Sequence, residues 1–165
     1  MKNACYVISP PFNNNRLFDA TDPVLNRDDC LLPYIILREK FRQAGFDLNT
    51  SDIIDPLECE IVLFHNMPEN MPLPALRNRA YLRLTEASVT RPDNWHLNRH
   101  KYFRRVFTWH DDLVDNNRYI KTNFPQIFPT KILNSMRDRR LCCLIARNKR
   151  LNHHCSGIVS NSSIS

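Results

Sequence analysis

Two short apolar runs, each with a carboxylate two residues after its end, constrain the fold of this chain more than any other feature. The first run, Tyr81–Leu84, is followed by Glu86, and the second, Val106–Trp109, is followed by Asp111 and Asp112. Apolar runs of this length between polar loops predict buried strands. Open α/β sheets place binding and catalytic side chains where strands end and loops begin. The two acidic strand ends therefore predict the rim of a binding cleft.

Strand and helix patterns alternate along the rest of the chain. Further strands are expected at residues 4–8, 60–64 and 141–146, and helices at about 30–44 and 95–102. Asp28 and Asp29 are candidate caps of the first helix, Pro33 fits only in its first turn, and Gly45 stands where a helix commonly ends. The alternation predicts an α/β fold with an open, Rossmann-like, mostly parallel sheet and flanking helices.

Composition excludes several classes of protein. A chain of 165 residues with 42% hydrophobic residues can form one domain with a sizeable core. It has no run near the roughly 20 apolar residues of a membrane span, and its first residues lack the pattern of a secretory leader. Six irregularly spaced cysteines then predict reduced thiols and a cytoplasmic location. With only two glycines and no phosphate-binding glycine motif, a complete nucleotide site is not expected.

A basic segment from Lys131 to Arg150 carries seven basic residues and one acid, Asp138, and so accounts for the formal net charge of +6. Such a segment attracts phosphates, RNA or an acidic partner, or forms a solvated basic face. An anion- or RNA-binding module is therefore an alternative function. Because aromatic residues are not interleaved with the bases and no RNA-binding motif is present, nucleic acid is not the expected partner.

Metal ligands are not predicted. His96 and His100 are four residues apart, as on one helix face, but no HExxH motif accompanies them. Cys142 and Cys143 are adjacent, so in a strand they point to opposite faces. The acidic pair that follows Trp109 lacks the spacing of a DxD motif and is expected to cap the next helix.

Six sequence motifs, in order, resemble the α1,3-fucosyltransferases (glycosyltransferase family 10), specifically the N-terminal half of the bacterial type. They are NRDDC at 26–30, DLNTSD at 47–52, RPDNW at 91–95, HKYF at 100–103, FTWHDDLVD at 107–115 and LCCLIARNKRLNHH at 141–154. Each motif alone is weak, but the ordered set is fairly specific and covers roughly the first 150 residues.

The resemblance implies one half of a two-domain, GT-B-like enzyme that transfers L-fucose from GDP-fucose to a sugar hydroxyl with inversion. It implies an acceptor-side α/β domain at residues 1–150 and a missing C-terminal domain that would bind GDP-fucose. The match ends after His154, and residues 151–165 are expected to be a polar, disordered tail. The reading frame is then expected to have ended early through a frameshift, which would leave this chain inactive alone, as a fucosyltransferase fragment or a non-catalytic acceptor-binding fragment.

The general base of the family falls on Glu86 by position. Inverting transfer needs a base that takes the proton of the acceptor hydroxyl, and one carboxylate is enough because the leaving diphosphate needs positive charge rather than an acid. Trp95 and Trp109 are candidates for stacking on a sugar ring, or they pack in the core. Arg91 and Asn94 are candidates for binding sugar hydroxyls, or they form a turn with the residues between them.

The expected partners are an acceptor oligosaccharide containing N-acetylglucosamine or glucose, and GDP-fucose as the donor substrate rather than a cofactor. The resemblance is compatible with peripheral contact with a membrane, without a transmembrane segment. The acceptor's identity, the choice between O3 and O4 and the oligomeric state do not follow from these motifs.

Overall fold

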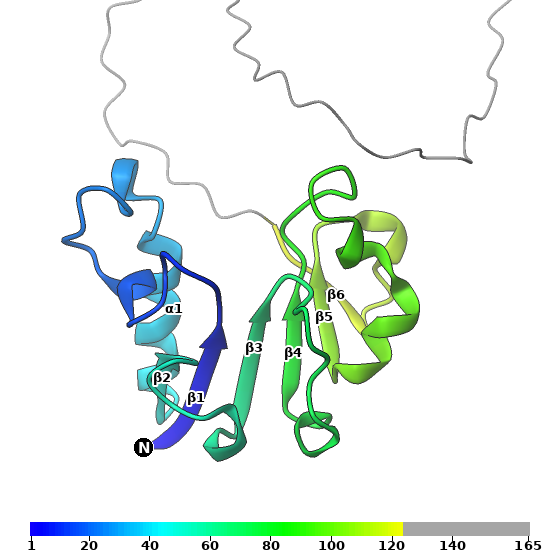
Figure 1. Cartoon of the computed structure of the whole chain (residues 1–165), viewed down its shortest axis with the longest axis horizontal. Helices are drawn as coiled ribbons and strands as arrows, with labels where there is room; N and C mark the ends of the chain where they lie inside the picture. The colour runs from blue at the N-terminus through cyan, green and yellow to red at the C-terminus, as the bar shows by residue number, and fades with distance from the viewer. Residues whose placement is uncertain (124–165) are drawn as a thin grey trace, which may run out of the picture. The chain divides into compact units, whose positions relative to one another are not determined.

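The computed structural model describes residues 1–123, which form a single six-stranded sheet in the order β2-β1-β3-β4-β5-β6 (Figure 1). The strands are β1 Lys2–Val7, β2 Phe46–Thr50, β3 Ile61–His65, β4 Ala80–Arg83, β5 Arg105–Thr108 and β6 Tyr119–Lys121. All five neighbouring pairs are parallel. The predicted open, parallel α/β sheet is confirmed.

The order of the strands reverses at β1. Strand β2 pairs with one side of β1, and β3 pairs with the other, after which the sheet continues in sequence order to β6. In open parallel sheets the crevice at the carboxyl ends of the strands on either side of such a reversal is the usual ligand site. The topology therefore predicts a ligand site at the carboxyl ends of β1, β3 and β4.

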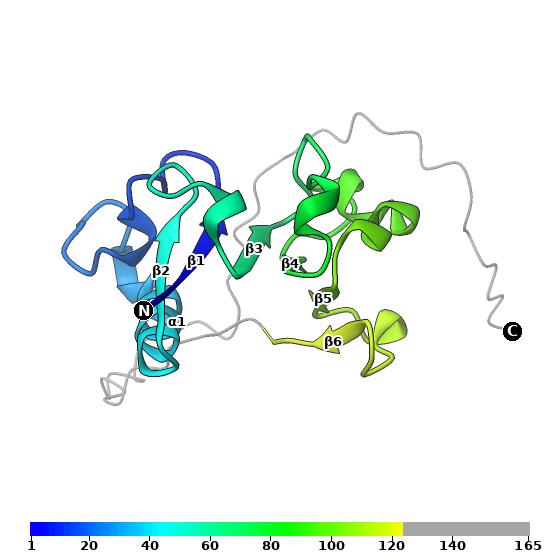
Figure 2. The same ribbon diagram turned by 90° about the horizontal axis from the view of Figure 1, so that it is seen from below.

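One α-helix, α1 (Leu32–Gln43), packs on the face of the sheet formed by β1 and β2, as Figure 2 shows. Its apolar side chains contact the buried residues of these strands; they are Tyr34, Ile35, Leu37 and Phe41 against Ala4, Tyr6 and Leu48. Pro33 lies in the first turn, as predicted, and Gly45 follows the helix with a φ of 86°. That left-handed backbone suits a residue without a side chain, so Gly45 ends the helix and begins β2.

The other face of the sheet carries the second core. Its buried residues come from β1, β3, β4, β5 and the loops between them, and include Cys5, Val62, Phe64, Leu82, Phe103 and Val106. Seven short 3-10 helices occur in the described loops: Arg16–Phe18, Arg27–Asp29, Pro56–Glu58, Pro74–Leu76, Pro92–Trp95, Leu97–Tyr102 and Asp111–Leu113. No helix in this part of the chain is long and apolar enough to cross a membrane.

Two expected helix starts were wrong. Asp28 and Asp29 do not cap α1: both are exposed with positive φ, and the side-chain oxygen of Asn26 instead accepts a hydrogen bond from the Leu31 N–H at 3.0 Å. The helix begins late because Pro33, which has no N–H and disrupts a helix interior, must occupy the first turn.

The acidic pair after Trp109 does not cap a helix either. Asp111 and Asp112 lie inside a three-residue 3-10 helix preceded by His110, with no side-chain cap. The helix expected at residues 95–102 is present as a 3-10 helix, Leu97–Tyr102, which His96 separates from the preceding 3-10 helix, Pro92–Trp95. The carbonyl of Asn94, which an α-helix would bond to the N–H four residues on, lies 2.9 Å from Nε2 of His100 instead.

The predicted strands at 4–8, 60–64, 81–84 and 106–109 are confirmed within a residue or two as β1, β3, β4 and β5. Strands β2 and β6 were not predicted. The strand expected at 141–146, the basic segment 131–150 and the tail 151–165 all lie outside the described residues.

Candidate functional site

Glu86 lies three residues beyond the end of β4 and lines a pocket of about 250 Å³. The other lining residues come from the start of α1 and from the ends of β3 and β4: Cys30, Pro33, Tyr34, His65, Arg83 and Thr85. This volume is close to the lower end of the range of roughly 300–1,000 Å³ that is typical of small-molecule sites. The prediction that Glu86 belongs to a binding cleft at a strand end therefore has a concave surface to support it.

The loop that carries Glu86 is held by two buried asparagines. The side-chain oxygen of Asn66 accepts hydrogen bonds from the backbone N–H and hydroxyl of Thr85 at 2.8 and 2.9 Å. Asn94 donates from its amide to Asn66 at 2.9 Å and to the carbonyl of Glu86 at 3.4 Å, and it accepts from the Met67 N–H at 2.8 Å. Asn94 is fully buried, so in this structure its amide positions the backbone of Glu86 rather than facing a ligand.

His65 lines the pocket and is held at both ring nitrogens. Nδ1 is 3.1 Å from the Tyr6 hydroxyl, and Nε2 is 3.4 Å from the Thr85 hydroxyl. Burial, reinforced by the positive charges of Arg83 and Arg91, lowers the pKa of His65 from 6.5 to about 4. The imidazole is therefore neutral at neutral pH and presents hydrogen-bonding groups without charge.

Because the pKa of His65 is lowered in the folded state, the unfolded chain binds the extra proton between pH 6.5 and about 4. We expect the free energy of unfolding to fall by about 2–3 kcal/mol across this window from His65. His100, whose pKa is also lowered by burial, adds to the loss in the same direction. Urea unfolding curves recorded at several pH values between 8 and 4 give the free energy of unfolding and so measure this loss.

The matched variants for this prediction are His65→Gln and, as a control, His96→Gln at an exposed position. The first should flatten the pH dependence of stability, since Gln does not titrate, and the second should leave it unchanged. If the free energy of unfolding of His65→Gln fell with pH as steeply as that of the unsubstituted chain, His65 would not be the source of the loss.

Arg83 is the cation of this pocket, and within residues 1–123 it forms no ion pair with a carboxylate. Its Nη1 donates a long hydrogen bond of 3.5 Å to the Tyr6 hydroxyl, and its guanidinium lies 5.3 Å from the centre of the Tyr34 ring. A largely buried guanidinium with spare donors is poised to bind an anion or a sugar hydroxyl.

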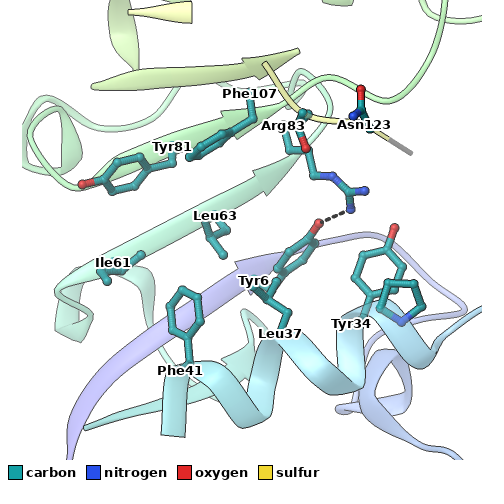
Figure 3. Close-up of a pocket in the computed structure, with 12 residues that line it drawn as sticks. Tyr6, Tyr34, Leu37, Phe41, Ile61, Leu63, Tyr81, Arg83, Phe107 and Asn123 are labelled. Carbon is teal, nitrogen blue, oxygen red and sulfur yellow. Dashed lines mark hydrogen bonds between the residues drawn. The ribbon is translucent and has the colours of Figure 1, made fainter. Parts of the chain in front are cut away.

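Arg83 and Tyr34 also line a neighbouring apolar groove of about 470 Å³. Figure 3 shows the guanidinium of Arg83 directed toward the hydroxyl of Tyr6, with Tyr34 beside it and the rings of Tyr81 and Phe107 on the sheet. Leu37 and Phe41 of α1 form the opposite wall. This groove supplies aromatic faces next to the polar pocket, as carbohydrate and cofactor sites often do.

Arg91 lines a second hollow, of about 620 Å³, that shares His65 with the Glu86 pocket. Its guanidinium makes a two-pronged ion pair with Asp93 at 2.8 and 3.0 Å and donates to the Met67 carbonyl at 2.8 Å. This pair holds the pKa of Asp93 below its usual range. The structure thus brings Arg91 near the Glu86 pocket, with its hydrogen bonds already committed to the loop.

Trp95 and Trp109 pack against each other rather than in the Glu86 pocket. Their rings meet edge to face at 6.1 Å, and His110 lies 5.1 Å from Trp95. The two acids that follow are exposed: Asp111 pairs with Lys121, and Asp112 lies 4.0 Å from His110. The two acidic strand ends predicted as one rim therefore occupy separate places, because neither of these acids lines the pocket of Glu86.

No three His, Cys, Asp or Glu side chains gather as metal ligands within residues 1–123. Cys5 and Cys59 are buried as free thiols, and burial raises the pKa of the Cys5 thiol far above its usual value. The Glu86 pocket presents one carboxylate, one guanidinium, one neutral imidazole, the Cys30 thiol and the hydroxyls of Tyr34 and Thr85.

Comparison with known proteins does not assign this site. No family model, no curated protein and no solved structure matches the chain.

Sequence reasoning missed Tyr34, His65 and Arg83. Two of them carried a signal: His65 ends the apolar run of β3, and Arg83 interrupts the apolar run of β4. A polar residue at such a position in a buried parallel strand is unusual and points to the functional edge of the sheet. Tyr34 carried no comparable signal, since it fits the apolar stripe of α1.

Proposed function

We propose that this chain forms the acceptor side of an inverting sugar transferase, with Glu86 as the base that takes the proton of an acceptor hydroxyl. The observation that carries the proposal is the pocket in which Glu86, Arg83 and neutral His65 meet at the carboxyl end of a parallel sheet. The ordered motifs that resemble α1,3-fucosyltransferases support the same class and favour L-fucose from GDP-fucose as the transferred group.

The proposed reaction is a single displacement. As the acceptor oxygen attacks the anomeric carbon of the donor, the bond from that carbon to the diphosphate breaks with both electrons on the leaving group. Glu86 accepts the hydroxyl proton, which makes the oxygen a competent nucleophile only as the new bond forms. Positive charge near the departing diphosphate stabilises the transition state, whereas Arg83, which lines the same pocket as Glu86, would bind the acceptor.

In this proposal the acceptor and the donor are bound by two different surfaces. The described residues would hold the acceptor and remove its proton, and the donor would be presented by a donor-binding half of the kind that the resembled family has. The small number of glycines fits this division, because a diphosphate site usually needs close approach of backbone N–H groups. Under this proposal the chain by itself binds acceptor without transferring fucose.

Titration of the chain with an oligosaccharide bearing N-acetylglucosamine, followed by amide chemical shifts, tests the acceptor assignment. We expect the shifts to concentrate on Tyr34, His65 and Arg83, and Arg83→Gln to weaken binding about tenfold, the usual effect of losing one charge-assisted hydrogen bond. Arg27→Gln removes an equal charge from an exposed loop and should leave the affinity unchanged.

The outcomes separate the candidate functions. Saccharide binding that depends on Arg83 favours the acceptor-side assignment. It does not test whether Glu86 acts as a base, which requires substitution of Glu86. The absence of saccharide binding at millimolar concentration contradicts the proposal. Strongly salt-dependent RNA binding in its place would favour the alternative of a basic nucleic-acid module.

A further inference from the structure

Five basic side chains line one hollow of about 380 Å³ at the edge of the sheet opposite Glu86. They are Arg77, Lys101, Arg104, Arg105 and Arg118. The remaining lining residues, Asn78, Phe103 and Asn117, carry no charge. We refer to this hollow as the basic pocket.

The parallel topology explains why these residues converge. Strands β4, β5 and β6 are neighbours, so the segments that lead into them meet at their amino ends. Arg77 precedes β4, Arg104 and Arg105 stand at the start of β5, and Arg118 immediately precedes β6. Glu86 lies beyond the carboxyl end of β4, so the basic pocket and the Glu86 pocket occupy opposite ends of the same strands.

The charge of the basic pocket is not neutralised by the described part of the protein. None of the ion pairs within residues 1–123 uses any of the five basic residues. Asp115 is the acid nearest in sequence to Arg118, and its carboxylate is already bonded to the N–H groups of Asn117 and Tyr119, at 2.8 Å each. Like charges that share one concave surface favour the binding of an anion.

Two of the guanidinium groups are fixed in place. Arg118 donates from Nη2 to the carbonyls of His100 and Phe103 at 3.1 and 3.2 Å, and its buried Nε finds no acceptor among the described residues. Arg104 donates from Nη1 to the Asn78 carbonyl at 3.3 Å and to the Tyr81 hydroxyl at 3.1 Å. Because these two are held before any ligand arrives, less conformational entropy is lost on binding. The other three cations are exposed and free to close on a ligand.

We propose that the basic pocket binds the phosphate group of a phosphorylated ligand. The planar guanidinium fork matches two oxygens of a phosphate, and several forks around one concavity suit a doubly charged group better than a single carboxylate. A hollow of this volume receives a terminal phosphate or diphosphate, whereas a nucleic-acid strand would need a basic track along the surface. The phosphate belongs either to a soluble ligand or to the headgroup of an anionic lipid.

Calorimetric titration of the full chain with inorganic pyrophosphate tests the proposal. Arg77→Gln and Arg105→Gln, both at exposed positions, should each weaken binding about tenfold, and the double variant about a hundredfold. Arg27→Gln lowers the net charge equally and should change the dissociation constant by less than about twofold. Affinity should fall as salt rises.

Vesicles identify the source of the phosphate. Co-sedimentation with phosphatidylglycerol vesicles, but not with phosphatidylcholine vesicles, that is lost in the double variant assigns a lipid headgroup. Pyrophosphate binding without vesicle binding assigns a soluble ligand. Either result supports the basic pocket.

Pyrophosphate binding that the double variant leaves intact overturns the proposal, because it would place the anion elsewhere, for example on the basic segment 131–150. The lack of any pyrophosphate binding at low salt also overturns it, as does preferential binding of RNA that both substitutions abolish. These results leave the function proposed for Glu86 untouched, since saccharide binding and its dependence on Arg83 are measured separately.

Discussion

Glu86→Gln is expected to lower the rate of fucosyl transfer by about 10²–10⁴, the usual contribution of a positioned general base. Gln keeps the size and most of the hydrogen-bonding geometry of Glu but cannot accept the hydroxyl proton. The measurement is kcat for transfer from GDP-fucose to an N-acetylglucosamine-containing acceptor. It uses a fusion of this chain to the donor-binding half of a bacterial α1,3-fucosyltransferase, with the unsubstituted fusion as the baseline.

Separate measurement of kcat and of the acceptor KM distinguishes a base from a residue that only binds the acceptor. If Glu86 acts only on the proton, kcat falls and the acceptor KM changes little, whereas loss of a binding contact raises KM. Glu58→Gln is the matched control, since Glu58 is an exposed carboxylate just before the amino end of β3. A Glu86→Gln fusion that transfers fucose at the unsubstituted rate would refute the assignment.

Asn94→Ala is expected to lower the free energy of unfolding by about 3–5 kcal/mol. The substitution leaves the buried Met67 N–H without its acceptor. It also removes one of three donors to the side-chain oxygen of Asn66, which keeps its two hydrogen bonds from Thr85. Each unsatisfied buried polar group costs about 1–3 kcal/mol, and the cavity left by the shorter side chain adds to the loss. Urea unfolding monitored by circular dichroism gives the difference.

Asn98→Ala, at an exposed position four residues further on, should change stability by no more than about 0.5 kcal/mol. The same experiment informs the site, because Asn94 also holds the carbonyl of Glu86. A loss below about 1 kcal/mol for Asn94→Ala would show that the buried hydrogen bonds of Asn94 contribute little to stability.

The predictable part of the fold was the part whose residues repeat a simple pattern. Strands β1, β3, β4 and β5 lie inside the sheet, so both of their faces are covered in part and their sequences read as apolar runs. The two strands that were missed, β2 and β6, are the edges of the sheet. Edge strands are often short or rich in polar residues. Strand β2 (FDLNT) contains polar residues and β6 (YIK) has three residues, so neither forms an apolar run that would predict a strand.

The candidate site divides in the same way. Glu86 was predicted because a carboxylate stands two residues after an apolar run, which is a local signal, and because the general base of the resembled family falls on it by position. Its separation from Asp111 and Asp112 was not predicted, because the direction of a loop after a strand depends on the hydrogen bonds that it makes. The buried pair Asn66 and Asn94 sets that direction for the Glu86 loop, and the two residues are far apart in the sequence.

The amino-acid sequence alone was enough for the class of fold, four strands of the sheet, and the place of Glu86 just beyond the carboxyl end of one of them. Those conclusions depend on residues that are neighbours in the sequence, because the spacing of apolar residues indicates which of them are buried. Only the tertiary structure decided that Tyr34, His65 and Arg83 line one pocket with Glu86, and that the arginines leading into β4, β5 and β6 share one hollow. The physical reason is the order of the parallel strands, which places side by side residues that the chain itself keeps far apart.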